Sequence, residues 1–175
     1  MAYTSSQVVQ AVPTGINSAL VYIGGGSLSG TSTTFSSMFS ATYNNYLVKI
    51  NSLTGSSATP VLLLTLGSAT TGYVYSQMYA NATAAWAFSA GSASASSIEL
   101  NQLGTVISST SMEIMSPFLA EKTTILSKGL NYTGSQWNET VGAHTGSTQF
   151  TAFTLASSTA ATLSGTVTVY GYTLS

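Results

Sequence analysis

The chain of 175 residues is long enough for one domain with a buried core, and its composition excludes several classes of protein. Only 4% of its residues are charged, three lysines and four glutamates, against about 25% in an average domain. Three scattered lysines cannot neutralise nucleic-acid phosphates, and the absence of cysteine excludes disulfides and thiolate metal sites. The hydrophobic fraction of 44% is ordinary, so we expect a folded chain whose surface is solubilised by hydroxyl and amide groups.

Residues 1–18 differ from the rest of the chain. Their valines are apolar, but Pro13 and Gly15 interrupt the segment before the first clear strand. We predict an N-terminal arm or edge strand over 1–18, with a frayed terminus as the alternative, and a single β-sandwich domain over 19–175. The chain shows neither the basic and apolar regions of a signal peptide nor an apolar run long enough for a bilayer, so we expect no contact with a membrane.

Short alternating or β-branched segments follow, separated by Gly, Ser and Asn turns. Residues 24–26 are three glycines that lack the lysine and following helix of a phosphate-binding loop, so they are predicted to form a flexible turn. Over 46–50 the apolar residues alternate with Lys49, which is the period of a half-buried strand. Val61–Leu66 is apolar on both faces, which indicates a central strand, and Pro60 precedes it where a missing N–H is tolerated.

The second half of the chain continues the pattern. Further strands are expected at residues 73–79, 86–88, 98–100, 112–114, 123–126, 150–155 and 165–172. In the last of them Val167 and Val169 share a face, and we predict that both lie in the core. Helix signals are weak, and 34–43 is the only stretch that suits one short turn. The fold class predicted is therefore all-β, an antiparallel β-sandwich of jelly-roll type with about 8–10 strands.

Few residues are candidates for catalysis. The only histidine, His144, lies in the turn-like sequence 142–146, and we favour a surface-turn residue over a general acid or base. A Ser-His-Asp triad cannot be built because the chain has no aspartate. Glu99 and Glu113 could approach each other across neighbouring strands, as glycosidase carboxylates do, but are better interpreted as solvated strand-face residues. We therefore predict no enzyme activity, no catalytic, cofactor-binding or metal-binding residue, and no cofactor.

Aromatic side chains are the remaining candidates for ligand contact. They could form an exposed platform that stacks on sugars, but aromatic residues on strands more often fill a core or a subunit interface, because they bury a large area. We favour the core or interface. The residues concerned are Tyr43, Tyr46, Tyr73, Tyr75, Tyr79, Trp86, Trp137 and Tyr170.

Three short motifs occur in a fixed order between residues 35 and 172. They are an aromatic-x2-aromatic strand at 43–46, an I-x-x-P segment at 114–117 and a terminal G-x-V-x-x-Y-G segment at 165–171. This order resembles that of jelly-roll virion proteins of tailed bacteriophages, especially marine and cyanobacterial ones. That loose group includes capsid decoration (cement) proteins and the tip domains of tail fibres. The resemblance implies a trimeric β-sandwich that attaches to a virion and has no chemistry of its own.

The function expected is that of a virion structural protein. We expect a capsid decoration protein, a homotrimer that binds the major capsid protein or other virion proteins and stabilises the capsid surface after synthesis in the host cytoplasm. The alternatives are a receptor-binding tail-fibre domain and a free carbohydrate-binding module. The compact size favours the capsid decoration protein. A tail fibre normally also has a shaft, and a free carbohydrate-binding module usually comes with a catalytic partner. Val8, Val9 and Val12 make the arm the candidate segment for reaching a neighbour.

Overall fold

The computed structural model describes residues 19–57, 60–81, 87–131 and 136–173, so the predicted arm lies outside the described residues. The described part contains strands and turns, with no helix and hence none able to cross a membrane, which confirms the all-β prediction. It has more strands than the sequence pattern predicts. In chain order they are β1 (Leu20–Leu28), β2 (Ser32–Phe35), β3 (Asn45–Gly55), β4 (Val61–Leu66), β5 (Tyr73–Asn81), β6 (Ala87–Ala95), β7 (Ile98–Gln102), β8 (Ser108–Met115), β9 (Thr123–Asn131), β10 (Gln136–His144), β11 (Phe153–Ser157) and β12 (Leu163–Tyr172).

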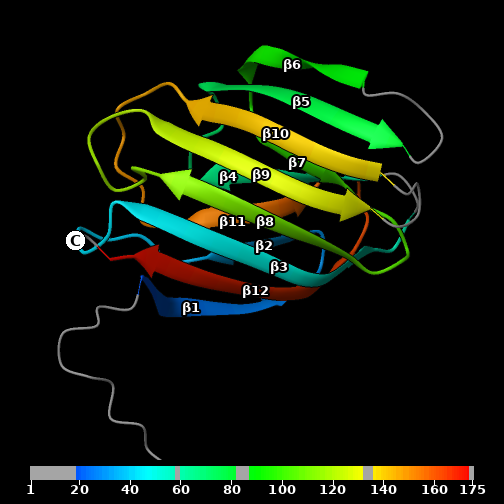
Figure 1. Cartoon of the computed structure of the whole chain (residues 1–175), viewed down its shortest axis with the longest axis horizontal. Helices are drawn as coiled ribbons and strands as arrows, with labels where there is room; N and C mark the ends of the chain where they lie inside the picture. Colours follow the sequence, from blue (N-terminus) through cyan, green and yellow to red (C-terminus); the bar gives the residue numbers. More distant parts are fainter. Residues whose placement is uncertain (1–18, 58–59, 82–86, 132–135, 174–175) are drawn as a thin grey trace, which may run out of the picture.

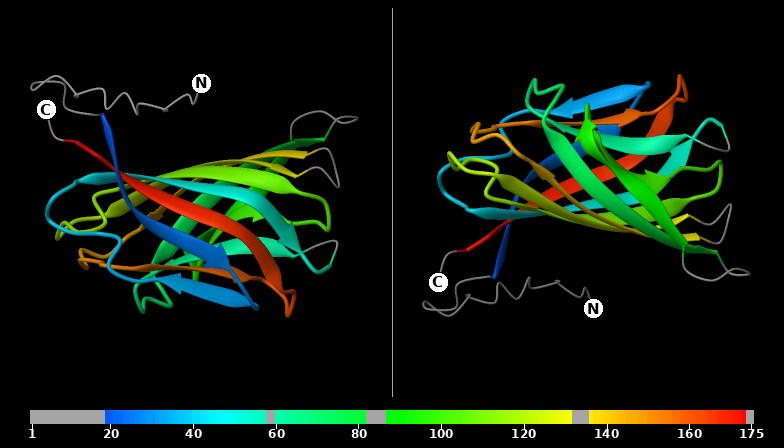
Figure 2. Two further views of the ribbon diagram at one scale, coloured as in Figure 1. Left: turned by 90° about the horizontal axis from the view of Figure 1, so that it is seen from below. Right: turned by 90° about the horizontal axis from the view of Figure 1, so that it is seen from above.

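The strands form two antiparallel sheets that pack face to face (Figures 1 and 2). The large sheet has eight strands in the order β1-β12-β3-β8-β9-β10-β5-β6, and the small sheet has four in the order β2-β11-β4-β7. Strand β4 lies between β11 and β7, as its two apolar faces predict. The molecule is therefore a β-sandwich, and its strands number twelve in the described residues rather than eight to ten.

Eight of the strands pair as one long folded ribbon. Strand β1 pairs with β12, β2 with β11, β3 with β8, and β4 with β7. Two further pairs, β12 with β3 and β11 with β4, close the ribbon into the two layers. The hairpins β5–β6 and β9–β10 are added to this ribbon, and both extend the large sheet beyond β8.

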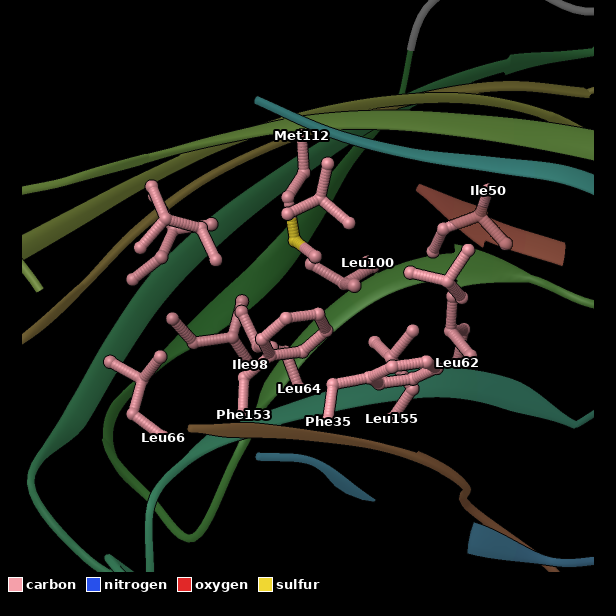
Figure 3. Packing of buried hydrophobic residues seen from close by; sticks show 14 of the residues in the cluster. Phe35, Ile50, Leu62, Leu64, Leu66, Ile98, Leu100, Met112, Phe153 and Leu155 are labelled. Carbon is pink, nitrogen blue, oxygen red and sulfur yellow. The ribbon is translucent and has the colours of Figure 1, made fainter. Parts of the chain in front are cut away.

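The apolar core lies where the small sheet faces the ribbon strands of the large one. Figure 3 shows Phe35 and Phe153 of the small sheet opposite Ile50 and Met112 of the large sheet. The ring of Phe153 stacks on Phe35 with a centroid distance of 5.1 Å and on Phe39 at 5.7 Å. Burial of each such side chain contributes about 1.5–3 kcal/mol, so this cluster accounts for much of the driving force for folding.

The alternating segments of the sequence predict the facing of the core strands correctly. The apolar residues at 46, 48 and 50 are fully buried in β3, and Lys49 between them is exposed. In β8, Met112 and Ile114 face the core. Val167 and Val169 of β12 are 1% and 0% exposed, which confirms their predicted place in the core.

The predicted turn at 24–26 is wrong, because these glycines lie inside β1. They pair with β12, and the register shifts between Tyr22 and Gly24. A Cβ atom on Gly25 would collide with the carbonyl oxygen of Val167. The glycines therefore allow the backbones of β1 and β12 to approach closely and do not form a bend. Close backbone approach is a known reason for glycine within a strand.

Candidate functional site

His144 is inside the sandwich, so its predicted place on a surface turn is wrong. The residue ends β10 and is 6% exposed, and its ring packs edge-on against Tyr73 at 5.1 Å and Phe150 at 4.9 Å between centroids. Its Nδ1 atom is buried without a hydrogen-bond partner in the described part of the chain. The prediction failed because the glycines around His144 suggested a turn. Gly142 lies instead inside β10, where a Cβ atom would lie 2.9 Å from Ile98 Cδ1.

Glu99 and Glu113 do not form a carboxylate pair, because β7 and β8 belong to different sheets. Each carboxylate is instead engaged by a tyrosine. Tyr172 donates a hydrogen bond to Glu113 Oε1 at 2.9 Å, and Tyr75 donates one to Glu99. Burial raises the pKa of Tyr75 to about 12, with the hydrogen bond to Glu99 and the charge of Glu99 as further causes. Both glutamates are half-buried rather than fully solvated.

The aromatic side chains do not form one platform. Tyr46 and Tyr73 are fully buried, which places them in the core as predicted. Tyr79 is half-buried in a cleft between the sheets, and Trp137 is 43% exposed on the outer face of the large sheet. Trp86 lies outside the described residues.

An exposed apolar surface lies on the outer face of the large sheet, over the two added hairpins. Its members are Phe88 (81% exposed), Leu126 (37%), Trp137 (43%) and Val141 (51%), which we call the outer patch. Leu126 and Val141 are direct cross-strand partners. On the same face, Lys128 Nζ and Glu139 Oε1 form an ion pair at 3.3 Å, so these two charges cancel.

The inner face of the same two strands is polar. Buried side chains that face inward from β9 and β10 are Thr123, Ser127, Asn131, Asn138, Thr140 and His144. Asn138 is linked to the small sheet by a hydrogen bond, because its Nδ2 donates to Oδ1 of Asn101 in β7 at 2.8 Å. Asn101 Nδ2 in turn donates to Oγ1 of Thr110 in β8 of the large sheet at 3.1 Å. Most inward side chains of β9 and β10 are therefore polar, with the fully buried Ile125 as the exception, while Leu126, Trp137 and Val141 face outward.

A cleft of about 290 Å³ opens between the two sheets at one end of the sandwich. It is lined by Val61, Gln77, Tyr79, Gln102, Gln136 and Asn138. These residues come from four strands, β4, β5, β7 and β10, and carry no charge. The sequence offered no signal for this cleft, because its residues form no local motif and meet only through the pairing of distant strands.

Metal ligands do not cluster in the described ranges, where no group of three or more His, Cys, Asp or Glu residues could hold an ion. Comparisons with protein-family models, with curated proteins and with solved structures found no match. The outer patch and the cleft are thus the two surface features from which a function can be argued.

Proposed function

We propose that this protein is a non-catalytic structural subunit of a bacteriophage virion. In this proposal it is a capsid decoration (cement) protein that forms a homotrimer, binds the capsid surface and stabilises it. The observation that carries the proposal is the outer patch. It gathers four of the large exposed apolar side chains of the described residues on one face, while Tyr22, Val106 and Ile107 are exposed elsewhere.

The outer patch reverses the usual order of an antiparallel sheet. Such a sheet, with one face in water, normally places its apolar residues inward and its polar residues outward. Strands β9 and β10 depart from this order at two cross-strand positions, where Leu126 and Val141 lie outward and Ser127 and Thr140 inward, although Ile125 keeps the usual inward place. Leu126 and Val141 form one exposed apolar group and Trp137 another, with the Lys128–Glu139 pair between them. Exposed apolar side chains gathered on one face of a soluble protein mark an interaction site. A partner that covers this face would remove the apolar surface from water.

A second copy of the chain is the occupant that fits the patch. The ion pair of Lys128 and Glu139 leaves these two charges without a net excess, so like faces can meet without repulsion between them. A hollow of about 570 Å³ adjoins the patch, lined in part by Val74, Val141 and Ala143, and offers room for an apolar side chain from a neighbour. In the proposed trimer the three patches would face the threefold axis, and each copy would contact its two neighbours through different parts of its outer face, which closes the assembly.

The strand connectivity supports assignment of the sandwich to the jelly-roll type. Without the hairpins β5–β6 and β9–β10, eight strands remain as a rolled ribbon with four in each layer. Jelly-roll domains have eight strands in two sheets and occur in viral capsids. The two hairpins that carry the outer patch are then additions to this framework.

Three observations support the non-catalytic part of the proposal. His144 is packed between two aromatic rings rather than in a cleft. Glu99 and Glu113 belong to different sheets. The lining of the cleft holds amides, a tyrosine and a valine, none of which serves as an acid or base near neutral pH.

Sedimentation of the full chain at low and at molar NaCl tests the assembly. We expect a trimer at both salt concentrations, because apolar and hydrogen-bonded contacts are not screened, while exposed ion pairs are screened over about 8–10 Å at physiological salt. A monomer at either concentration, or dissociation on addition of NaCl, would contradict the proposal.

The location is tested separately by imaging the native particle with this protein identified in it. We expect density on the capsid surface between capsomers, and weaker attachment for a chain that lacks residues 1–18. Density at the tail alone would replace the decoration protein with the tail-fibre alternative. Full coating of particles by the truncated chain would remove the role given to the arm.

A further inference from the structure

The cleft lies at the end of the sandwich opposite to the ends of the terminal strands. Leu20 and Tyr172 pair at one end, whereas β12 begins at Leu163 beside Gly55 at the other end. The cleft is at this second end, where Val61 pairs with Gln102. A protein attached through its terminal segments would therefore point the cleft away from the attachment.

The deep wall of the cleft is held rigid by buried hydrogen bonds. Asn138 and Gln77 are 3% and 8% exposed, and each directs its NH₂ group into the interior. Asn138 Nδ2 donates to Asn101, and Gln77 Nε2 donates to Thr140 Oγ1 at 3.2 Å. Thr140 Oγ1 in turn donates to the carbonyl oxygen of Leu100 at 3.4 Å. Because both NH₂ groups are engaged in the interior, the amide oxygens are the polar atoms that these two lining residues can offer to a ligand as acceptors.

The mouth of the cleft adds groups of matching chemistry. Gln102 and Gln136 are half-buried there, and each amide can both donate and accept hydrogen bonds. Tyr79 adds an aromatic ring and a hydroxyl group. The site therefore combines fixed acceptors, adaptable amides and one aromatic surface, without a charged side chain in its lining.

We infer that this cleft binds a short neutral saccharide. Sugar hydroxyls donate to the fixed carbonyl oxygens and exchange hydrogen bonds with the two glutamines, and the C–H face of a sugar ring packs on the tyrosine. An apolar ligand would leave buried carbonyl oxygens without partners, which costs free energy. A charged ligand would find no opposite charge in the lining. The volume of about 290 Å³ is near the lower end of the roughly 300–1,000 Å³ of ligand sites, which suits a short ligand.

This inference goes beyond the proposed function and does not depend on it, because the cleft is formed within one chain. A rival site exists on the outer face, where a hollow of about 190 Å³ beside Trp137 is lined also by Lys49 and Lys128. The two sites use opposite faces of β10 and can be separated by mutation.

The test is titration calorimetry of the full chain with glucose, galactose, mannose, N-acetylglucosamine and their disaccharides, and with glucuronic and sialic acid for comparison. We expect saturable binding of at least one neutral sugar, weakened roughly tenfold or more by the double variant Gln102→Leu and Gln136→Leu through lost hydrogen bonds. Gln149→Leu, an exposed amide at the opposite end, and Trp137→Ala should bind as the wild type does. The melting temperature of every variant shows whether it is folded.

Several outcomes would overturn the inference. They are no binding of any neutral sugar, binding of the acidic sugars alone, unchanged affinity in the double variant, or loss of binding in Trp137→Ala. If the double variant does not fold, NMR of the wild-type chain decides. The side-chain amide signals of Gln102 and Gln136 should shift on addition of the sugar, and shifts confined to the outer face would contradict the site.

Discussion

The large sheet contains two regions with opposite arrangements of polar and apolar residues. In β3 and β12, Val48 and Val169 face the small sheet, and Lys49 lies outside. In β9 and β10, Ser127 and Thr140 face inward, and Leu126 lies outside. The first region buries its apolar side chains within one chain, so it satisfies the hydrophobic effect without a partner. The second satisfies it only if another surface covers the outer face.

This difference separates the strands that stabilise the fold from those that we propose for contact with other copies. The ribbon strands build the apolar core of Figure 3, and their removal from water drives folding. The added hairpins build a hydrogen-bonded interior, and they carry both the outer patch and two strands of the cleft. Substitutions in the two regions should therefore have different consequences.

The largest loss of stability is expected from Phe153→Ala in the apolar region. Phe153 is fully buried and stacks on two other rings, so truncation should cost about 3–5 kcal/mol through lost burial and a cavity. Phe88→Ala is the matched control in the dissociated chain, because the same change at a position 81% exposed there should alter the free energy of unfolding of the single chain by no more than about 0.5 kcal/mol. Denaturant unfolding of both variants measures the difference. Equal losses would mean that Phe88 is covered within the single chain.

A smaller loss is expected from Asn101→Ala in the polar region. The change removes two hydrogen bonds and leaves buried groups of Asn138 and Thr110 unpaired, which should cost about 1–3 kcal/mol. Asn51→Ala, at an exposed position, provides the comparison. Urea unfolding of the two variants checks the prediction. An unchanged midpoint for Asn101→Ala would show that water replaces the amide network without loss.

His144 sharpens the contrast, since the surface-turn interpretation and the buried position predict different results. His144→Ala should lower the free energy of unfolding by about 1–3 kcal/mol, because a cavity forms between Tyr73 and Phe150. His144→Phe should be closer to the wild type, because it keeps the ring contacts and removes the unpartnered Nδ1. Thermal melting of both variants distinguishes the cases. An unchanged melting temperature for His144→Ala would contradict the buried position and favour the surface-turn interpretation.

The sequence predicts the fold class and most of the ribbon strands because their alternation is regular, but β2 (Ser32–Phe35) was not predicted. Residues 46–50 and 165–172 each contain the period of a half-buried strand, and the structure confirms their inward faces. The C-terminal half of β1 and all of β10 were missed, since glycines at 24–26 and at Gly142 and Gly146 resemble turns.

The outer patch and the cleft could not be predicted from the sequence for a different reason. A strand that shifts its register by one residue exchanges its two faces, so facing depends on partners far along the chain. Alternation alone would place Leu126 and Val141 inward, where Ser127 and Thr140 lie. The cleft likewise depends on the pairing of Gln136 with Asn81, which no local pattern encodes.

Alkaline pH should weaken the sandwich through its buried tyrosines. Burial raises the pKa of Tyr73 and that of Tyr75, the latter to about 12, so the folded state disfavours their ionisation. This contribution to stability is complete below the ordinary value of about 10 and is lost as the pH rises through about 12. Unfolding free energies measured across this interval should fall, and less steeply for Tyr75→Phe. A flat profile would contradict the burial of these hydroxyl groups.

The smallest effect on the stability of the single chain, and the largest on assembly, is expected at the outer patch. Lysines at two exposed positions, in the double variant Leu126→Lys and Val141→Lys, should change the unfolding free energy of each chain by only about 0.5 kcal/mol per site. Four like charges or more at a contact between copies should prevent association. Thr148→Lys with Thr162→Lys adds the same charge at exposed positions in loops and serves as the control.

Sedimentation velocity of the wild type and these two double variants tests most directly whether copies of the chain cover the apolar outer face. We expect a trimer for the wild type and the control. For the patch variant we expect a folded monomer, whose melting temperature is lower only by what assembly contributes. A monomeric wild type, or a patch variant that still sediments as a trimer, would contradict it.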